Sequence, residues 1–122
     1  MSYSETVLDH FENPRNVGDL ADADAEVRLE HPVCGDIMKL AVKLAEGRIG
    51  QVKFRTRGCV AAIAAGSCLT ELIAGKSVAE AGALKREQLH EALGGLPEAS
   101  AHATHLAMDV LERVLGKLRK SP

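Results

Sequence analysis

Three short stretches of the chain alternate strictly between apolar residues and polar or small ones. They span residues 26–30, 38–44 and 51–57. A period of two residues is typical of strands that bury one face. Glu46 and Gly47 form a short turn signal between the second and third stretches, and short connections favour antiparallel pairing. The pattern therefore predicts a three-stranded antiparallel sheet with one polar face.

The rest of the chain predicts helices. Residues 4–12 and 100–118 carry apolar stripes at helical spacing, and residues 59–74 are almost entirely apolar and rich in alanine. Between the last two helices, residues 77–80 match a capping box and residues 87–93 form a second short helical stretch. A helix without a polar stripe must be buried, so we expect the alanine-rich helix to cover the apolar face of the sheet. The expected fold class is α+β, a small three-stranded antiparallel sheet with helices packed on one face.

Length and composition fit one globular domain. The chain has 122 residues, of which 46% are hydrophobic and 26% charged, and we expect a single domain over residues 1–122. The formal net charge is -2 and the aromatic content 2%, with no tryptophan. The chain thus lacks both the basic surface that attracts nucleic acids and anionic membranes and the rings on which single strands stack. We expect neither nucleic acid nor a membrane among its partners.

The first residues and the cysteines indicate a cellular location. Residues 1–5 lack the basic start and apolar run of a signal peptide, and no stretch approaches the roughly 20 apolar residues of a membrane span. The three cysteines are an odd number, and a chain of this length folds without disulfides. We therefore expect a cytoplasmic protein whose cysteines are free thiols, available to bind a metal.

Candidate metal ligands stand at the ends of the predicted elements. Cys34 and Asp36 precede the second strand, and Gly35 between them allows a tight turn that aims thiolate and carboxylate at one ion. Cys59 begins the apolar helix, where unpaired backbone N–H groups favour a thiolate. His102, at the start of the last helix, would complete a set of four. Position alone leaves each cysteine equally open to being a small buried hydrophobe, and for His102 it favours a surface histidine.

Several longer runs of residues match one known family. They are Tyr3-Ser4-Glu5, Asp9-His10-Phe11-Glu12-Asn13-Pro14-Arg15-Asn16-Val17-Gly18, Cys34-Gly35-Asp36-Ile37-Met38-Lys39-Leu40, Gly58-Cys59, Ala62-Ile63-Ala64, Thr70-Glu71 and Gly75-Lys76-Ser77. On these runs the chain resembles the IscU and NifU N-terminal scaffolds for iron–sulfur cluster assembly over nearly its whole length. The resemblance implies a SufE/NifU-like fold. It also implies a scaffold rather than an enzyme, one that builds a [2Fe–2S] cluster from iron and sulfur supplied by a cysteine desulfurase and passes it to recipient apo iron–sulfur proteins.

The resemblance also assigns the site. Cys34 and Cys59 match two of the family's three cluster cysteines, Asp36 its acidic partner and His102 its histidine. These four residues would hold the [2Fe–2S] cluster or, in the resting protein, a zinc ion. In second rank, Lys39 matches a lysine near the site and Tyr3 a tyrosine of the N-terminal segment.

Two departures from the family pattern affect function. The family usually has His-Cys where this chain has His102-Ala103, so the third cluster cysteine is absent. His105, one turn further, is a candidate replacement, although a solvent-exposed position is the simpler interpretation, and Cys68 is expected in the core because it points to the far side of its helix from Cys59. In the loop before the last helix, residues 96–100 read Leu-Pro-Glu-Ala-Ser in place of the chaperone motif Leu-Pro-Pro-Val-Lys. This change argues against binding of an Hsp70-type chaperone.

The missing cysteine leaves two alternatives to the scaffold. The protein could be a zinc-bound regulatory or desulfurase-binding protein that has lost assembly activity, or a carrier of persulfide sulfur on one cysteine. The remaining histidines have simpler interpretations. His31 is expected at the surface after a strand, and the pattern assigns no chemistry to His10 or His90.

Overall fold

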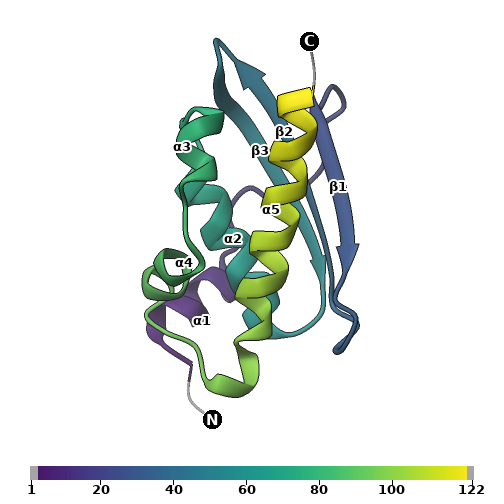
Figure 1. The fold of residues 1–122 in the computed structure, drawn as a ribbon. Helices are drawn as coiled ribbons and strands as arrows, with labels where there is room; N and C mark the ends of the chain where they lie inside the picture. Colours follow the sequence, from purple (N-terminus) through teal and green to yellow (C-terminus); the bar gives the residue numbers. More distant parts are fainter. Residues whose placement is uncertain (1–2, 121–122) are drawn as a thin grey trace.

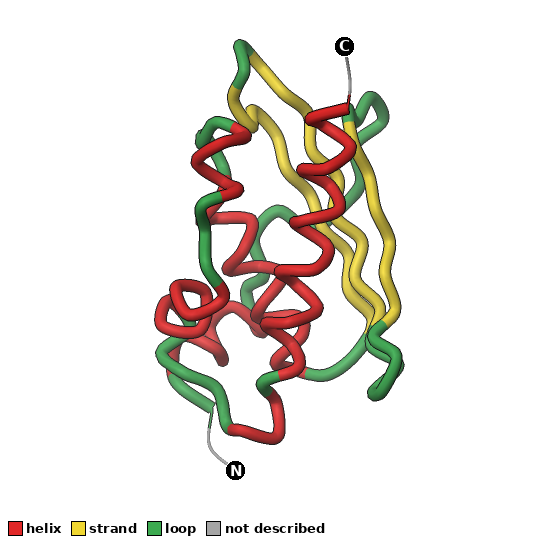
Figure 2. The backbone as a smooth tube through the Cα atoms, viewed as in Figure 1, coloured by secondary structure: helices red, strands yellow, loops and turns green. Residues whose placement is uncertain are grey.

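The computed structural model describes residues 3–120. Along the chain the elements are α1 (Glu5–Glu12), β1 (Ala25–Glu30), β2 (Ile37–Ala45), β3 (Arg48–Arg57), α2 (Val60–Ile73), α3 (Val78–Gly82), α4 (Arg86–Ala92), the 3₁₀-helix η1 (Glu98–Ser100) and α5 (His102–Lys120). The sheet forms one layer and the helices lie on one of its faces (Figures 1 and 2). The expected fold class is confirmed, and each predicted strand and helix is present.

The three strands follow the chain in the order β1-β2-β3, and each neighbouring pair is antiparallel. Between β2 and β3, Glu46 and Gly47 have φ values of 54° and 78°, the two positive values that a tight hairpin turn requires. The register places Leu40 between Val27 on β1 and Phe54 on β3. Leu40 is 0% and Phe54 1% exposed, so the alternation in the sequence does mark the buried face.

Two helices cover that face. The central helix α2 packs against β3, and α5 packs against β1 and β2 (Figure 1). Alanine is the commonest of the buried residues of α2, which lets the helix approach the sheet closely. A Cβ atom built on Gly66 would lie 2.6 Å from the ring of Phe54, so only glycine fits at this crossing. The absence of a polar stripe on α2 is therefore explained by its central position.

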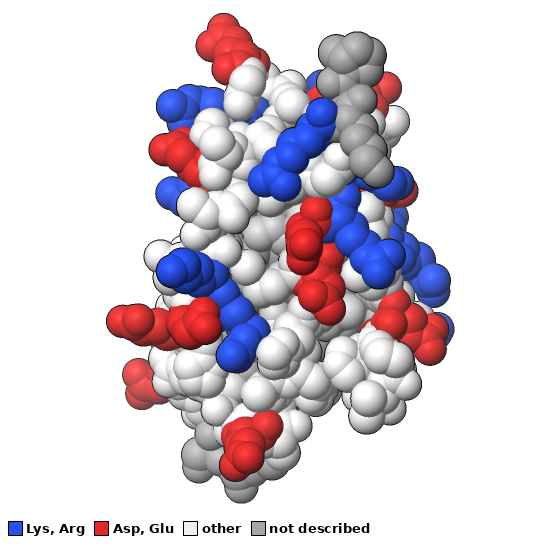
Figure 3. Space-filling model, viewed as in Figure 1, with Lys and Arg blue, Asp and Glu red and all other residues white. Residues whose placement is uncertain are grey.

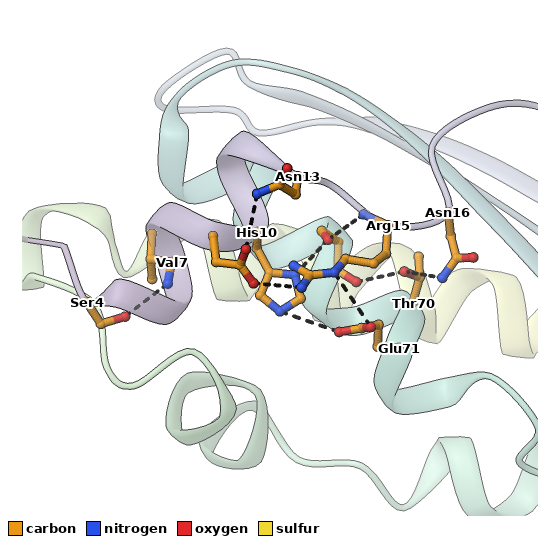
Figure 4. Close-up of polar contacts among 10 residues, drawn as sticks. Ser4, Val7, His10, Asn13, Arg15, Asn16, Thr70 and Glu71 are labelled. Carbon is orange, nitrogen blue, oxygen red and sulfur yellow. Dashed lines mark hydrogen bonds and ion pairs between the residues drawn. The ribbon is translucent and has the colours of Figure 1, made fainter.

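The N-terminal helix is tied to α2 by buried polar contacts (Figure 4). The Nδ1 atom of His10 lies 2.7 Å from Ser67 Oγ, which also accepts the backbone N–H of Arg15 at 2.9 Å. Asn16 donates to Thr70 Oγ1 at 3.1 Å. Because the Ser67 hydroxyl accepts from Arg15, its own proton can go to His10, whose ring is then neutral with its proton on Nε2. His10, which the sequence left without a role, thus fixes α1 and the following loop.

This buried histidine makes stability depend on pH. Burial lowers the pKa of His10 below its usual 6.5, as does the nearby Arg15 charge, while Glu71 and Asp9 oppose the shift. The unfolded chain therefore binds the proton more readily, so the contribution of His10 is complete above pH 6.5 and is lost as pH falls below it. As pH falls below 6.5, we expect the free energy of unfolding to fall with a slope of up to about 1.4 kcal/mol per pH unit. Urea unfolding of wild type and His10→Gln checks this, and equal slopes in both proteins would contradict it.

The charged side chains are distributed over the helix-covered surface as the small net charge suggests. On the face covered by helices, acidic and basic side chains are interspersed, with no large area of one sign (Figure 3). Within residues 3–120, no helix is both long and apolar enough to cross a membrane.

Candidate metal centre

The turn between β1 and β2 carries two of the predicted ligands. His31 and Asp36 close it, since the His31 N–H donates to the Asp36 carbonyl at 2.7 Å and the Gly35 N–H donates back to the His31 carbonyl at 2.9 Å. Gly35 has a φ of 78°, which favours glycine. The turn leaves Cys34 exposed and directs Asp36 into the protein, so that Asp36 is only 9% exposed.

The Asp36 carboxylate lies at the middle of the site. The Cys59 thiol donates to its Oδ2 at 3.2 Å, and His102 Nε2 lies 3.5 Å from the same oxygen. Cys59 Sγ and His102 Nε2 are 3.9 Å apart. Gly58 makes room for this packing, because a Cβ atom there would stand 2.5 Å from the Asp36 carboxyl carbon. Three segments distant in sequence thus meet at one carboxylate.

Cys34 belongs to the same group. Its Sγ and the ligand atoms of Asp36 and His102 all lie within 4.8 Å of one another. Zinc bonds of about 2.0–2.3 Å place tetrahedral ligand atoms roughly 3.3–3.8 Å apart. The separations among Asp36, Cys59 and His102 are close to this range, and Cys34 stands beside them on an exposed turn. The structure therefore brings together all four residues that the sequence singled out.

The environment of Cys59 keeps it protonated while no metal is bound. Burial raises the pKa of its thiol, the Ala62 N–H acts in the opposite direction, and Asp36 raises the pKa further. Cys59 is also the N-cap of α2, where its Sγ accepts the Ala62 N–H at 3.4 Å. A metal ion would have to displace the proton shared with Asp36, whereas the N-cap contact favours the resulting thiolate.

His31 is the residue that the sequence analysis underestimated. Its ring is half-buried, with its centroid 5.4 Å from that of His102. Its Nδ1 atom accepts the backbone N–H groups of Val33 at 3.2 Å and Cys34 at 3.3 Å. His31 thus holds the turn that presents Cys34. A hydrogen-bond acceptor just before Pro32 and three residues before Cys34 was the available signal, comparable to the side-chain caps of Asx turns.

The candidates of second rank lie elsewhere. Lys39 pairs with Asp19, and its Nζ lies 3.8 Å from a carboxylate oxygen of Glu26, on the outer face of the sheet. The Tyr3 hydroxyl lies 3.2 Å from Ser100 Oγ. Neither contact reaches the metal-centre residues.

The possible substitutes for the missing cysteine are not at the centre either. Ala103 is fully buried in the core, and His105 is solvent-exposed. Cys68 is 4% exposed within the hydrophobic core, as expected from its helix position. In the part of the chain that the structure describes, one group of potential metal ligands is close enough to share an ion, and it consists of Cys34, Asp36 and His102. Cys59 contacts two of its members, Asp36 and His102.

The three thiols are expected to react at very different rates. Cys34 is exposed and Cys59 half-buried, and burial raises the pKa of Cys68 to about 11. Since the thiolate is the nucleophile, iodoacetamide at pH 8 should alkylate Cys34 first, Cys59 later and Cys68 hardly at all. Mass spectrometry of peptides taken over time checks the order, with urea-unfolded protein as the control in which all three react. Alkylation of Cys68 as fast as Cys34 in the folded protein would refute this burial.

The chain is similar to several known proteins and to one family model. A family model described as the NifU-like N-terminal domain matches residues 2–122. The chain is 48% identical over 113 residues to "Iron-sulfur cluster assembly scaffold protein IscU 1" of Archaeoglobus fulgidus, covering 93% of this chain and 74% of that protein. It is 45% identical over 119 residues to the protein of Haemophilus influenzae named iron-sulfur cluster assembly scaffold protein IscU, covering 94% of each.

The comparison of structures supports the fold. The N-terminal NifU-like protein of Brucella abortus superposes with a TM-score of 0.81 at 16% identity, over 98% of this chain and 95% of that one. An identity this low supports the architecture alone. The family model and the relatives with 45% and 48% identity show more than the fold. Together they show that the chain belongs to the family of NifU-like N-terminal domains.

Proposed function

We propose that this protein is a scaffold for iron–sulfur cluster assembly, which binds iron and a [2Fe–2S] cluster and passes the cluster to recipient apo proteins. The observation that carries the proposal is the convergence of Cys59 and His102 on the Asp36 carboxylate, with Cys34 in the same group. The relatives named as IscU scaffolds support it. We further propose that residues 1–122 act as one domain.

Each ligand would contribute differently. Thiolates are the usual ligands of iron in clusters, so Cys34 and Cys59 would hold the iron most firmly. Asp36 is a harder and weaker partner for iron, which favours exchange, and His102 supplies a borderline nitrogen ligand. In the resting protein the same four residues would hold zinc. A site whose ligands exchange suits a platform that gives up its cargo, rather than an enzyme with turnover of its own.

The partners follow from this role. A cysteine desulfurase would supply sulfur at Cys34, which stands exposed on its turn. Because the loop at residues 96–100 lacks the chaperone motif, we propose that delivery proceeds without an Hsp70-type chaperone. The proposed location is the cytoplasm.

Anaerobic reconstitution tests the function. Purified protein is incubated with ferrous iron, cysteine and a cysteine desulfurase, and the visible sulfide-to-iron charge-transfer bands are followed. The proposal expects these bands and their transfer to an apo ferredoxin. If zinc binds while no such bands form, the scaffold function fails.

One alternative is supported by a specific observation. Separations of 3.2, 3.5 and 3.9 Å among Asp36, Cys59 and His102 suit a tetrahedral zinc site, and the position of the third cysteine holds Ala103. A zinc-bound regulatory protein that binds a cysteine desulfurase would have this geometry. It predicts stoichiometric zinc in protein as isolated, unchanged by a desulfurase, iron and cysteine. A persulfide carrier would instead gain one sulfur atom on Cys34 or Cys59, visible by mass spectrometry.

A further inference from the structure

Three cations stand in register across the outer face of the sheet. Lys39 on β2 is paired with Arg28 on β1 and with Arg55 on β3. Like charges directly opposite one another destabilise a sheet, so this row carries an energetic cost. Asp19 offsets part of it through contacts with Lys39 and, at 3.0 Å, with Arg55 Nε, and a carboxylate oxygen of Glu26 lies 3.8 Å from Lys39 Nζ. Arg28 forms no ion pair within residues 3–120.

The row borders a hollow of about 400 Å³, a volume within the range of small-molecule sites. We call it the outer hollow, and its lining comprises Arg28, Ile37, Lys39, Arg55, Thr56 and Arg57. Four of these six residues are cations and none is an acid. Arg57 is exposed and, like Arg28, has no ion pair in the described part of the chain. Glu30 lies on the neighbouring row, opposite Ile37, and it too has no ion pair there.

The cations alone characterise the outer hollow as a site for a ligand. Thr56 offers it no side-chain group, because Thr56 is paired with the fully buried Met38 and its buried Oγ1 atom therefore lies on the face of the sheet that the helices cover. Arg28 and Arg57, which have no ion pair within residues 3–120, lie beside two further cations. Such a group of guanidinium and ammonium groups favours an anionic ligand.

The outer hollow lies at the same end of the sheet as the metal centre. Ile37 follows Asp36 directly, and Arg57 precedes Cys59 by two residues. Since consecutive Cα atoms are about 3.8 Å apart, the Cα atoms of Ile37 and Arg57 lie within one and two such steps of those of Asp36 and Cys59. The metal centre lies on the side of the helices, and the hollow on the opposite face.

We propose that the outer hollow binds a small polycarboxylate anion, and with it the ferrous iron that such anions chelate. Arginine matches a carboxylate with two parallel hydrogen bonds, and two or more carboxylates would engage several cations at once. The choice of an iron-carrying anion rests on the scaffold function proposed above, whereas the binding of a polycarboxylate does not. Iron would then pass as Fe(II), without oxidation or reduction.

The transfer is an exchange of ligands. Carboxylate oxygens are released from Fe(II) as the thiolates of Cys34 and Cys59 bind it, and each thiol gives its proton to solvent. The direction is favourable because thiolate is a softer and stronger partner for iron than carboxylate. The freed polycarboxylate then leaves the outer hollow.

Titration of metal-free protein tests the binding site. Citrate is added to ¹⁵N-labelled protein at constant ionic strength, with acetate and inorganic phosphate as separate arms. We expect saturable citrate shifts at the amides of Arg28, Ile37, Lys39, Arg55 and Arg57, and no saturation with acetate. Phosphate binding as strong as citrate would overturn the polycarboxylate assignment, and the absence of saturable citrate shifts would overturn the site.

Two variants, each lacking one positive charge, give the matched comparison. Arg57→Gln removes a lining cation, whereas Lys76→Gln removes an exposed cation next to the far end of β3, where the Ile49 N–H donates to the Lys76 carbonyl. Citrate should bind Arg57→Gln about tenfold more weakly and Lys76→Gln as it binds wild type. At the same concentration, citrate should also raise the melting temperature of wild type more than that of Arg57→Gln. Equal affinity in the two variants would refute the proposal.

The proposed role of the outer hollow in iron delivery is tested separately. With Fe(II) citrate as the iron source, Arg57→Gln should slow cluster formation several-fold relative to Lys76→Gln, while uncomplexed ferrous iron should give equal rates. If citrate binds but the iron source makes no difference, the anion site stands and its role in iron delivery is overturned. If no cluster forms in any protein, the scaffold function itself fails.

Discussion

Cys59→Ala is expected to weaken zinc binding by more than about 100-fold and to abolish the charge-transfer bands of a reconstituted cluster. Changing only an outer partner of a metal ligand typically costs 10- to 100-fold in affinity, so loss of a thiolate ligand should cost more. Cys59 also lies closest to the Asp36 carboxylate, at 3.2 Å, and its loss would open the centre of the site. Competition with a chelator of known affinity measures the change.

Cys68→Ala is the matched control for this experiment. It also removes one thiol from α2, but Cys68 lies in the hydrophobic core and contributes no atom to the metal centre. Its affinity for zinc should equal that of wild type, although the lost core volume should cost some stability. Circular dichroism shows whether both variants fold. If Cys59→Ala binds zinc as tightly as Cys68→Ala does, Cys59 is not a ligand.

Gly66→Ala is expected to lower the free energy of unfolding by about 2 kcal/mol. Its Cβ would stand 2.6 Å from the Phe54 ring and 3.3 Å from the Met38 side chain, so α2 would have to move away from the sheet. Overpacking a core by a methyl or methylene group typically costs about 1–3 kcal/mol. This cost should exceed the gain of up to about 1 kcal/mol that alanine brings to a helix interior.

Gly116→Ala provides the opposite case within the same protein. Gly116 lies in α5, and a Cβ there would meet nothing within 4 Å. Only the helix propensity then changes, and the free energy of unfolding should rise by about 0.5–1 kcal/mol. Urea unfolding of the two variants beside wild type measures both effects. Changes of the same sign would mean that the close approach of α2 to β3 does not limit the residue at position 66.

Much of the fold was predictable from local patterns. The alternation of apolar residues marked all three strands, and the Glu46-Gly47 turn correctly indicated their antiparallel pairing. The capping box at Ser77 and Glu80 is present, with each side chain bonded to the other residue's backbone N–H. These features succeeded because they depend on residues near one another in sequence, whose preferences packing did not override.

The sequence did not indicate the structural roles of His10 and His31. His10 lies on a short amphipathic helix, and no residue near it in sequence indicates its hydrogen-bond partner Ser67, which lies 57 positions further along the chain. His31 precedes a proline at the end of a strand, which is usually a solvent-exposed position. In both cases the partner is either distant in sequence or a backbone N–H group, so residue type alone carries no signal.

The sequence by itself determined which elements form, which faces are apolar and, through the family's motifs, which four residues belong together. Only the tertiary structure decided that Cys59 and His102 meet at the Asp36 carboxylate, because α2, α5 and the β1–β2 turn converge only once the sheet is covered. It also set three of the four cations of the outer hollow, Arg28, Lys39 and Arg55, in one row. Strand register fixes such neighbours, and the register is chosen by the packing of the whole sheet rather than by any one strand.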